Sequence, residues 1–254
     1  MIMMTANQLL MRTIVVSFSD YLCTRIGSVG VGIFQLIMSV YSFAVTLATS
    51  GIRFTTTRLV SEELGKESGV GVRRAVKNCL FYALLFSTAT GILLFCNAEL
   101  IGTHWLNEPQ TISSLKILSF ALPFLSLTSV LGGYFTAVRK TVRSSVIQIT
   151  DQLIMVFISV TGLTLLLPKG LEYACIALVL GSCASEVVAF CLMLLNYQLD
   201  KRKLNKNNID SGKILPRLLK ISLPIAFSAY ARSGLYTLQN ILIPRGLKKF
   251  GAYK

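Results

Sequence analysis

A single arginine interrupts the last apolar stretch of the chain, between Lys220 and Arg245. Arg232 stands about midway between these two residues, so a helix through the stretch places its guanidinium near the middle of a membrane. A charge there costs about 3 kcal/mol on insertion scales and requires a partner or a water-filled cavity. Arg232 is therefore a candidate for binding an anionic substrate group in a cavity. The alternative is a buried ion pair that fixes helix packing.

Two acids interrupt other apolar stretches. Glu186 lies 14 residues from the nearest acid on either side, which gives it a depth similar to that of Arg232. It is a candidate for ion coupling, as a proton site or as the countercharge of Arg232. Asp151 follows Arg143 by eight residues, about 12 Å along a helix, and is a second ion-coupling candidate. For Asp151 the alternative is a hydrogen bond to a neighbouring residue or to a facing helix.

Arg25 and Arg53 bracket an uncharged apolar run, so a helix between them places the two arginines at opposite faces of the membrane. Both are candidates for binding substrate in a cavity. Their long stems also allow the charged groups to reach the interface from the ends of a helix, and the residues by themselves favour this interpretation.

Prolines and paired glycines occur within two of the apolar stretches. Pro123 and Pro224 each remove a backbone hydrogen bond from a helix, and Gly132 with Gly133 permits a bend or a close helix contact. Alternating access requires helices that bend, so these four residues are candidate gating or hinge positions. Packing alone is the alternative.

The sequence shows no pattern typical of catalysis, of a metal site or of a cofactor site. The only histidine is His104, the six cysteines contain no CxxC pair, and a Walker-type loop is absent. Three of the cysteines, Cys175, Cys183 and Cys191, recur every eight residues and are typical of small buried apolar residues. We predict a carrier and not an enzyme, without a metal ion or cofactor.

The apolar stretches predict the elements that position these residues. Hydrophobic residues make up 53% of the 254 residues and charged residues only 14%, whereas soluble domains have about 25% charged residues. A helix of about 20 apolar residues crosses a membrane. We predict an all-α polytopic membrane protein with seven transmembrane helices, at 1–22, 25–53, 77–99, 116–139, 144–168, 173–199 and 221–244.

The basic residues predict the orientation. Most Lys and Arg residues fall in 53–77, 139–143 and 201–220, and the positive-inside rule places these loops and the N-terminus in the cytoplasm. His104 and Trp105 then lie outside. The net charge of +14 therefore reflects loops of a membrane protein and not a nucleic-acid surface. Within the first basic loop we expect a short interfacial helix that ends at Gly65.

The chain divides into three predicted parts. Residues 1–199 form a six-helix lobe, and 200–213 form a polar cytoplasmic linker. Residues 214–254 form the first helix of an incomplete second lobe. The ending NILIPRGLKKFG weakly repeats residues 20–30, as expected for parallel repeats of a transporter.

Several runs carry a resemblance to a known family. They are RIGSVGVGIFQLIMSVYSFAVTLATSGI (25–52), TRLVSEELGK (57–66), LSFALPFLSLTSVLGGYFTAVRK (118–140) and ISLPIAFSAYARSGLYTLQNILIPRGLKKFG (221–251). This pattern resembles the stage V sporulation protein B group of oligosaccharide flippases. The group belongs to the superfamily that also contains lipid II flippases and multidrug extruders.

The resemblance implies a plasma-membrane transporter with two lobes that face a central cavity. It implies a lipid-linked oligosaccharide, or a peptidoglycan or polysaccharide precursor, as substrate, with membrane lipids and a second lobe as partners. Cavity arginines bind the head group in lipid II flippases, and Arg25 and Arg53 lie near comparable places without a matching motif. The resemblance also implies that this chain is an N-terminal portion. The alternatives are a cation-coupled multidrug extruder and a truncated membrane scaffold without transport activity.

Overall fold

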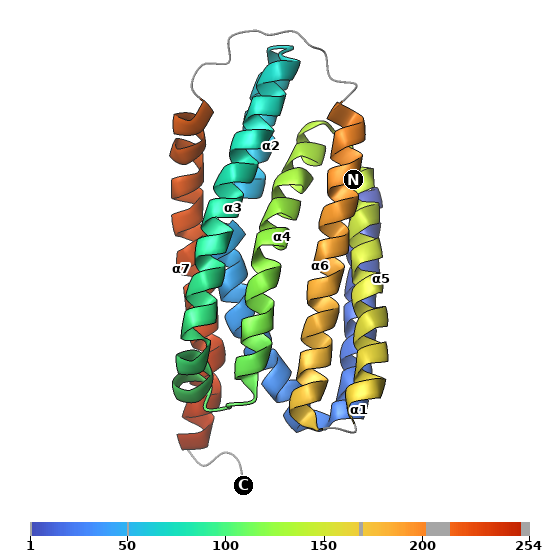
Figure 1. Cartoon of the computed structure of the whole chain (residues 1–254), viewed down its shortest axis with the longest axis vertical. Coiled ribbons are helices and arrows are strands. Elements are labelled where there is room, and N and C mark those ends of the chain that lie inside the picture. The colour runs from blue at the N-terminus through green and yellow to red at the C-terminus, as the bar shows by residue number, and fades with distance from the viewer. Residues whose placement is uncertain (1, 50, 168–169, 202–213, 250–254) are drawn as a thin grey trace.

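The computed structural model describes residues 2–49, 51–167, 170–201 and 214–249, with side chains for 9–49, 51–167, 170–201 and 214–235. These residues form a bundle of long helices (Figure 1). The helices are α1 (Ile2–Thr49), α2 (Ile52–Gly65), α3 (Gly69–Leu100), α4 (Thr111–Ala137), α5 (Thr141–Leu166), α6 (Leu171–Lys201) and α7 (Ile214–Lys249), and a π-helical turn, η1 (Ile101–Trp105), follows α3. The prediction of an all-α polytopic membrane protein is confirmed.

Six helical stretches of the described chain are long and apolar enough to cross a membrane. They are Leu9–Gly65, Gly69–Trp105, Thr111–Ala137, Thr141–Leu166, Leu171–Lys201 and Ile214–Leu235. The first has 57 residues, about 86 Å of helix, which is far more than one crossing of about 30 Å requires. It contains two of the predicted crossings.

Gly27 divides α1 into a first pass (2–26) and a second pass (28–49). Its φ of 76° and ψ of 173° are not helical, and a positive φ of this kind favours glycine because it has no Cβ. Phe18 from the first pass and Phe34 from the second pack against one hydrophobic cluster, with Leu22 and Leu178. The two passes therefore lie side by side, as predicted for separate helices at 1–22 and 25–53.

A second glycine connects α1 to α2. Gly51 has a φ of 66°, and a Cβ at this position would lie 2.4 Å from the Ile225 side chain of α7. No larger residue fits without displacing α7. The glycine thus permits both the bend after α1 and the close approach of α7.

The helix α2 ends at Gly65, as predicted, but it is not a separate interfacial helix. Leu59 and Val60 are buried, with exposed fractions of 2% and 0%, and α2 packs against α3 and α4. Ile52, Leu59 and Val60 form, with the buried Thr55 and Thr56, one face that the bundle covers, whereas Phe54 is exposed. The expectation of an interfacial helix was wrong because that face completes the core.

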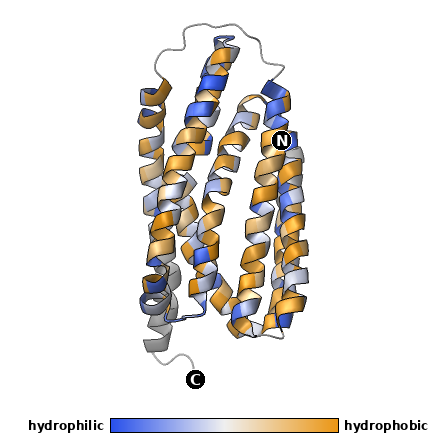
Figure 2. Cartoon of the chain, in the orientation of Figure 1, coloured by the Kyte–Doolittle hydropathy of each residue, from blue (hydrophilic) through white to orange (hydrophobic). Residues whose placement is uncertain are grey.

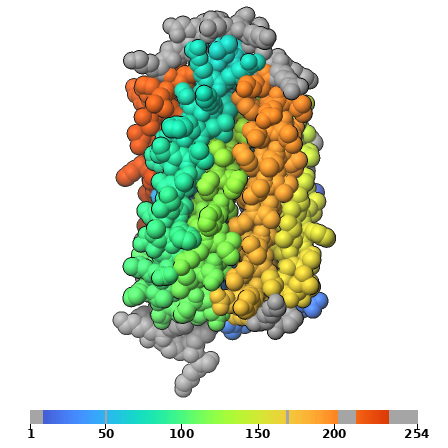
Figure 3. Space-filling view, viewed as in Figure 1, coloured from blue at the N-terminus to red at the C-terminus, as the bar shows by residue number. Residues whose placement is uncertain are grey.

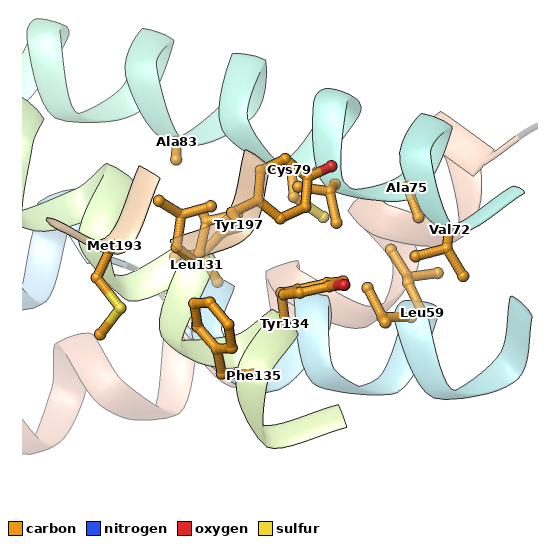
Figure 4. Packing of buried hydrophobic residues seen from close by; sticks show 14 of the residues in the cluster. Leu59, Val72, Ala75, Cys79, Ala83, Leu131, Tyr134, Phe135, Met193 and Tyr197 are labelled. Carbon is orange, nitrogen blue, oxygen red and sulfur yellow. The ribbon is translucent and has the colours of Figure 1, made fainter. Parts of the chain in front are cut away.

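Two large clusters of buried residues form the core along the bundle. One, toward the end that carries α2, joins α2, α3, α4, α6 and α7 and includes Leu59, Val72, Tyr134, Phe135 and Met193 (Figure 4). The other includes Ile37, Leu94, Leu118, Cys175 and Val179. Large apolar side chains also cover the outside, such as Phe81, Phe157 and Phe227, while hydrophilic residues gather toward the ends (Figure 2). This distribution is the one expected of a bundle that faces lipid.

Candidate functional site

The structure brings Asp151 and Glu186 together between α5 and α6. Asp151 lies ten residues into the 26-residue α5, and Glu186 lies fifteen residues into the 31-residue α6. The two carboxyl groups are close enough to interact electrostatically, and Ser185 lies beside Asp151. Both acids are only partly accessible. Sequence analysis identified each residue as an ion-coupling candidate but did not predict that they are neighbours.

The environment of the pair is polar but incompletely satisfied. Among the described side chains, Oδ1 of Asp151 and Nε2 of Gln152 are buried without a protein hydrogen-bond partner. Buried polar atoms are nearly always paired, so such atoms mark a place for water, an ion or a ligand group. Two carboxyl groups that feel each other's charge within a membrane span are suited to bind a proton or a cation.

Tyr41, from the second pass of α1, completes the site. Its hydroxyl lies close enough to Glu186, Cys183 and Asp151 for electrostatic interaction. Sequence analysis missed this residue because a tyrosine in an apolar run has no distinguishing pattern. The thiol of Cys183 lies 3.6 Å from the carbonyl oxygen of Ile117, so its contact is with the backbone of α4.

A cavity of about 240 Å³ lies next to this site, between the two passes of α1, α5 and α6. Its walls are mainly apolar, and Ser19, Gln35, Gln152 and Ser182 contribute polar groups. Asp151, Glu186 and Tyr41 are not among its lining residues, but Gln152 follows Asp151 in sequence and Ser182 lies one helical turn before Glu186. Pockets for small molecules have about 300–1,000 Å³, so this cavity accommodates an ion, water or part of a larger ligand.

Arg232 does not form the ion pair with Glu186 that we considered as an alternative. Arg232 is exposed on α7, and among the described residues no ion pair joins it to Glu186. The hydroxyl of Tyr230 donates a hydrogen bond of 3.3 Å to the carbonyl of Leu47. The helix α7 therefore packs on the second pass of α1, which lies between Arg232 and Glu186.

The two other arginine candidates lie apart from each other. Arg53 is exposed at the start of α2, and its Cζ lies 3.8 Å from the position that a Cβ on Gly132 would take. Arg25 is exposed beside the reversal at Gly27, with its Cζ 5.7 Å from the ring centre of Tyr21. The structure thus brings Arg53 to α4 and leaves Arg25 at the opposite end of the second pass.

The candidate hinge glycines lie at a close contact between α2 and α4. A Cβ on Gly133 would lie 2.6 Å from the carbonyl oxygen of Arg53 and 3.0 Å from Cβ of Thr56. Thr57 donates a hydrogen bond of 3.1 Å to the carbonyl of Gly133. Close packing therefore requires Gly133, and bending at this pair stays a prediction.

The two prolines lie inside helices. Pro123 has no N–H for the carbonyl of Ser119, one turn earlier in α4. That carbonyl approaches Gly91 of α3, where a Cβ would lie 2.9 Å from it. Pro224 is exposed on α7. The gating role of both prolines remains a prediction.

Buried acids at the α2 end of the bundle form ion pairs that the sequence did not indicate. Asp200, which is 3% exposed, pairs with Lys140 and, at 3.6 Å, with Arg143. Glu63 pairs with Lys66 at 2.9 Å and with Arg217 at 3.9 Å. These contacts connect α6 to the turn between α4 and α5, and α2 to α7. No group of three or more potential metal ligands occurs in the part of the chain that the structure describes.

These features together define a polytopic membrane protein with paired carboxylates beside an internal cavity, an arrangement typical of secondary transporters. A family model described as polysaccharide biosynthesis protein matches residues 2–252, so the chain belongs to the polysaccharide biosynthesis protein family. The family predicted from the sequence is confirmed.

One relative supports the same assignment. The chain is 26% identical over 235 residues to stage V sporulation protein B of Bacillus subtilis (strain 168). The alignment covers 87% of this chain and 44% of the relative, so the chain spans less than half of that protein's length. No solved structure matches the chain.

Proposed function

We propose that this chain is one lobe of a flippase-like exporter that moves a lipid-linked oligosaccharide or another polysaccharide precursor by alternating access. Residues 1–199 form the lobe, 200–213 the linker and 214–254 the first helix of a second lobe. Residues 202–213 and 250–254 lie outside the described residues. Because the alignment covers 44% of the relative, the transport activity is proposed for this lobe together with a second one.

The observation that carries this proposal is the Asp151–Glu186 pair beside the cavity. Binding of a proton or cation lowers the negative charge of the pair, and with it the electrostatic repulsion between Asp151 on α5 and Glu186 on α6. Such a site gives an ion gradient a place to act on the arrangement of the helices. In this proposal the carboxylates couple the ion and Tyr41 connects them to α1.

Arg232 is the proposed contact for the anionic head group. An arginine near the middle of a membrane span does not face lipid at low cost, yet within this chain its side chain is exposed. The exposed face of α7 is therefore the proposed boundary with the second lobe, where a central cavity forms. A planar guanidinium suits the bidentate recognition of a phosphate.

We propose that the protein lies in the plasma membrane. Its basic end, which carries α2, then faces the cytoplasm. The basic residues at 53–77, 139–143 and 201–220 support this orientation through the positive-inside rule. The N-terminus is then cytoplasmic.

A cation-coupled multidrug extruder is the second candidate, because paired carboxylates serve that activity as well. The match to the polysaccharide biosynthesis protein family favours the saccharide precursor. A membrane scaffold without transport activity is the third candidate, and its function would not depend on the carboxylate pair.

Transport by proteoliposomes that contain the lobe with a second lobe tests the proposal. We expect Glu186→Gln and Asp151→Asn each to reduce movement of a fluorescent lipid-linked oligosaccharide at least about tenfold. Glu172→Gln, the same change at the end of the same helix, is the control and retains activity. If both Glu186→Gln and Asp151→Asn move the lipid-linked oligosaccharide at the full rate, ion coupling at these two residues is contradicted. If the protein exports a drug in place of the saccharide, the multidrug extruder is favoured.

A further inference from the structure

A second cavity, of about 290 Å³, lies at the basic end between the start of α3 and the end of α6. Four of the residues that line it are cations, Arg73, Arg74, Lys77 and Lys201, and none is an acid. Nη2 of Arg73 donates a hydrogen bond of 2.8 Å to the carbonyl of Lys201, which connects the two helices. The cavity is thus a basic pocket on the outside of the bundle.

Nearby acids do not neutralise the exposed cations of this cavity. Asp200 pairs with Lys140 and Arg143, and Glu63 pairs with Lys66. Among the residues that the structure describes, none of the ion pairs includes Arg74, Lys77 or Lys201. Three cations next to an apolar surface, without a carboxylate ion-pair partner in the described part of the chain, favour binding of an anion.

An apolar path begins one turn below the cations. Lys77 is the last charged residue of α3 before Glu99. The next turns of α3 present Phe81 and Leu84 on the outside of the bundle. Leu84 also lines a groove of about 440 Å³ between α3 and α4, whose walls include Phe95 and Phe120.

The dimensions of this surface match those of a lipid. Lys77 and Leu84 are seven residues apart, about 10 Å along the helix. Half of the hydrocarbon core of a membrane is about 15 Å thick, so a chain anchored at Lys77 reaches the groove within one leaflet. In Figure 3, side chains of α3, α4 and α6 form one continuous face of the bundle.

We propose that the basic cavity binds the phosphate of an anionic phospholipid, and that the acyl chain of this lipid follows α3 into the apolar groove. Basic pockets between transmembrane helices are suited to such head groups. The site lies on α3, α4 and α6, whereas the proposed transport cavity lies between α1, α5 and α6. The lipid site is therefore independent of the proposed transport function.

Native mass spectrometry of the 254-residue chain in detergent, titrated with phosphatidylglycerol, tests this site. A basic residue contributes about 1 kcal/mol to binding of an anionic lipid, or about fivefold in affinity. We expect Arg74→Gln and Lys77→Gln each to weaken binding about fivefold. Lys220→Gln makes the same change of charge at the same end of the bundle, outside the cavity, and is expected to change the affinity less than about twofold.

Two further arms identify the ligand. Phosphatidylcholine is expected to bind at least about tenfold more weakly, and excess inorganic phosphate is expected not to displace the bound lipid. Equal binding by all variants, an equal loss in Lys220→Gln, or equal binding of phosphatidylcholine overturns the proposal. Displacement by inorganic phosphate also overturns it, because the cavity would then hold a free anion. Unchanged circular dichroism confirms that the exposed substitutions leave the fold intact.

Discussion

Alanine substitutions at the adjacent residues Gly132 and Gly133 separate close helix packing from bending. A Cβ at position 133 would lie 2.6 Å from the backbone oxygen of Arg53 and 3.0 Å from the buried Thr56. A Cβ at position 132 would meet its nearest neighbours at 3.8 Å or more, which is ordinary contact. The same change on the same helix is therefore expected to have opposite effects.

The magnitudes follow from two opposing contributions. Replacing glycine by alanine within a helix stabilises it by about 1 kcal/mol, and this gain applies to both positions. Overpacking at Gly133 costs about 1–3 kcal/mol, because the neighbour that must move is the backbone of α2. We expect Gly132→Ala to be neutral or stabilising by up to about 1 kcal/mol, and Gly133→Ala to be destabilising by up to about 2 kcal/mol.

Thermal unfolding of the purified variants in detergent measures this difference. For a chain of this size a change of 1 kcal/mol shifts the midpoint by about 2–4 °C, so Gly133→Ala is expected to lower it by up to roughly 8 °C and to unfold at a lower temperature than Gly132→Ala. Equal midpoints for the two variants would refute the packing argument. Loss of transport in Gly132→Ala, with its stability intact, would instead be the signature of a hinge.

Three other predictions concern single residues. Asp200→Asn is expected to lower the free energy of unfolding by about 1–3 kcal/mol, because it removes the buried charge that pairs with Lys140. The loss is limited because Lys140 is partly exposed and water can solvate its ammonium group. An unchanged unfolding midpoint would contradict this prediction. In the chain combined with a second lobe, the Arg232→Lys variant is expected to assemble normally but to transport poorly, because lysine lacks the planar group that binds a phosphate through two hydrogen bonds. Normal transport by this variant would exclude the head-group contact. In a variant without native cysteines, an impermeant thiol reagent added outside is expected to label the variant His104→Cys but not the variant Lys203→Cys. The reverse labelling pattern would show the opposite orientation in the membrane.

The helices could be predicted because hydrophobicity along the chain indicates depth. Uncharged runs such as 26–52 located the crossings, and charged residues such as Lys77 and Arg139 marked their ends. The break between the first two crossings was predicted at residues 23–24, whereas the structure has it at Gly27, whose positive φ is a property of the folded chain. The place of α2 could not be predicted in this way, since a short mixed segment fits either the bundle or the interface.

The sequence predicted how deep the candidate site residues lie in the membrane, but not which neighbouring helix each side chain faces. The sequence placed Glu186 and Arg232 at similar depths, which suggested an ion pair, and gave no indication that Asp151 lies beside Glu186. Which way a side chain faces around a helix depends on how the helices pack. The partners of Glu186 therefore required the structure, which provides Asp151 and Tyr41 and excludes Arg232 as its ion-pair partner.

The second pass of α1 connects the two halves of the proposed mechanism. Tyr41 and Phe43 are two residues apart, about 200° around a helix and about 3 Å along it, so they lie at one depth on opposite faces. Tyr41 borders Glu186, whereas Phe43 lies 3.8 Å from the position of a Cβ on Gly234, close to Arg232 on α7. A rotation or shift of this one helix alters both contacts at once. In the proposed mechanism the carboxylate pair and the exposed arginine need no direct contact, because a shift of the helix between them would carry a change in the charge of one to the position of the other.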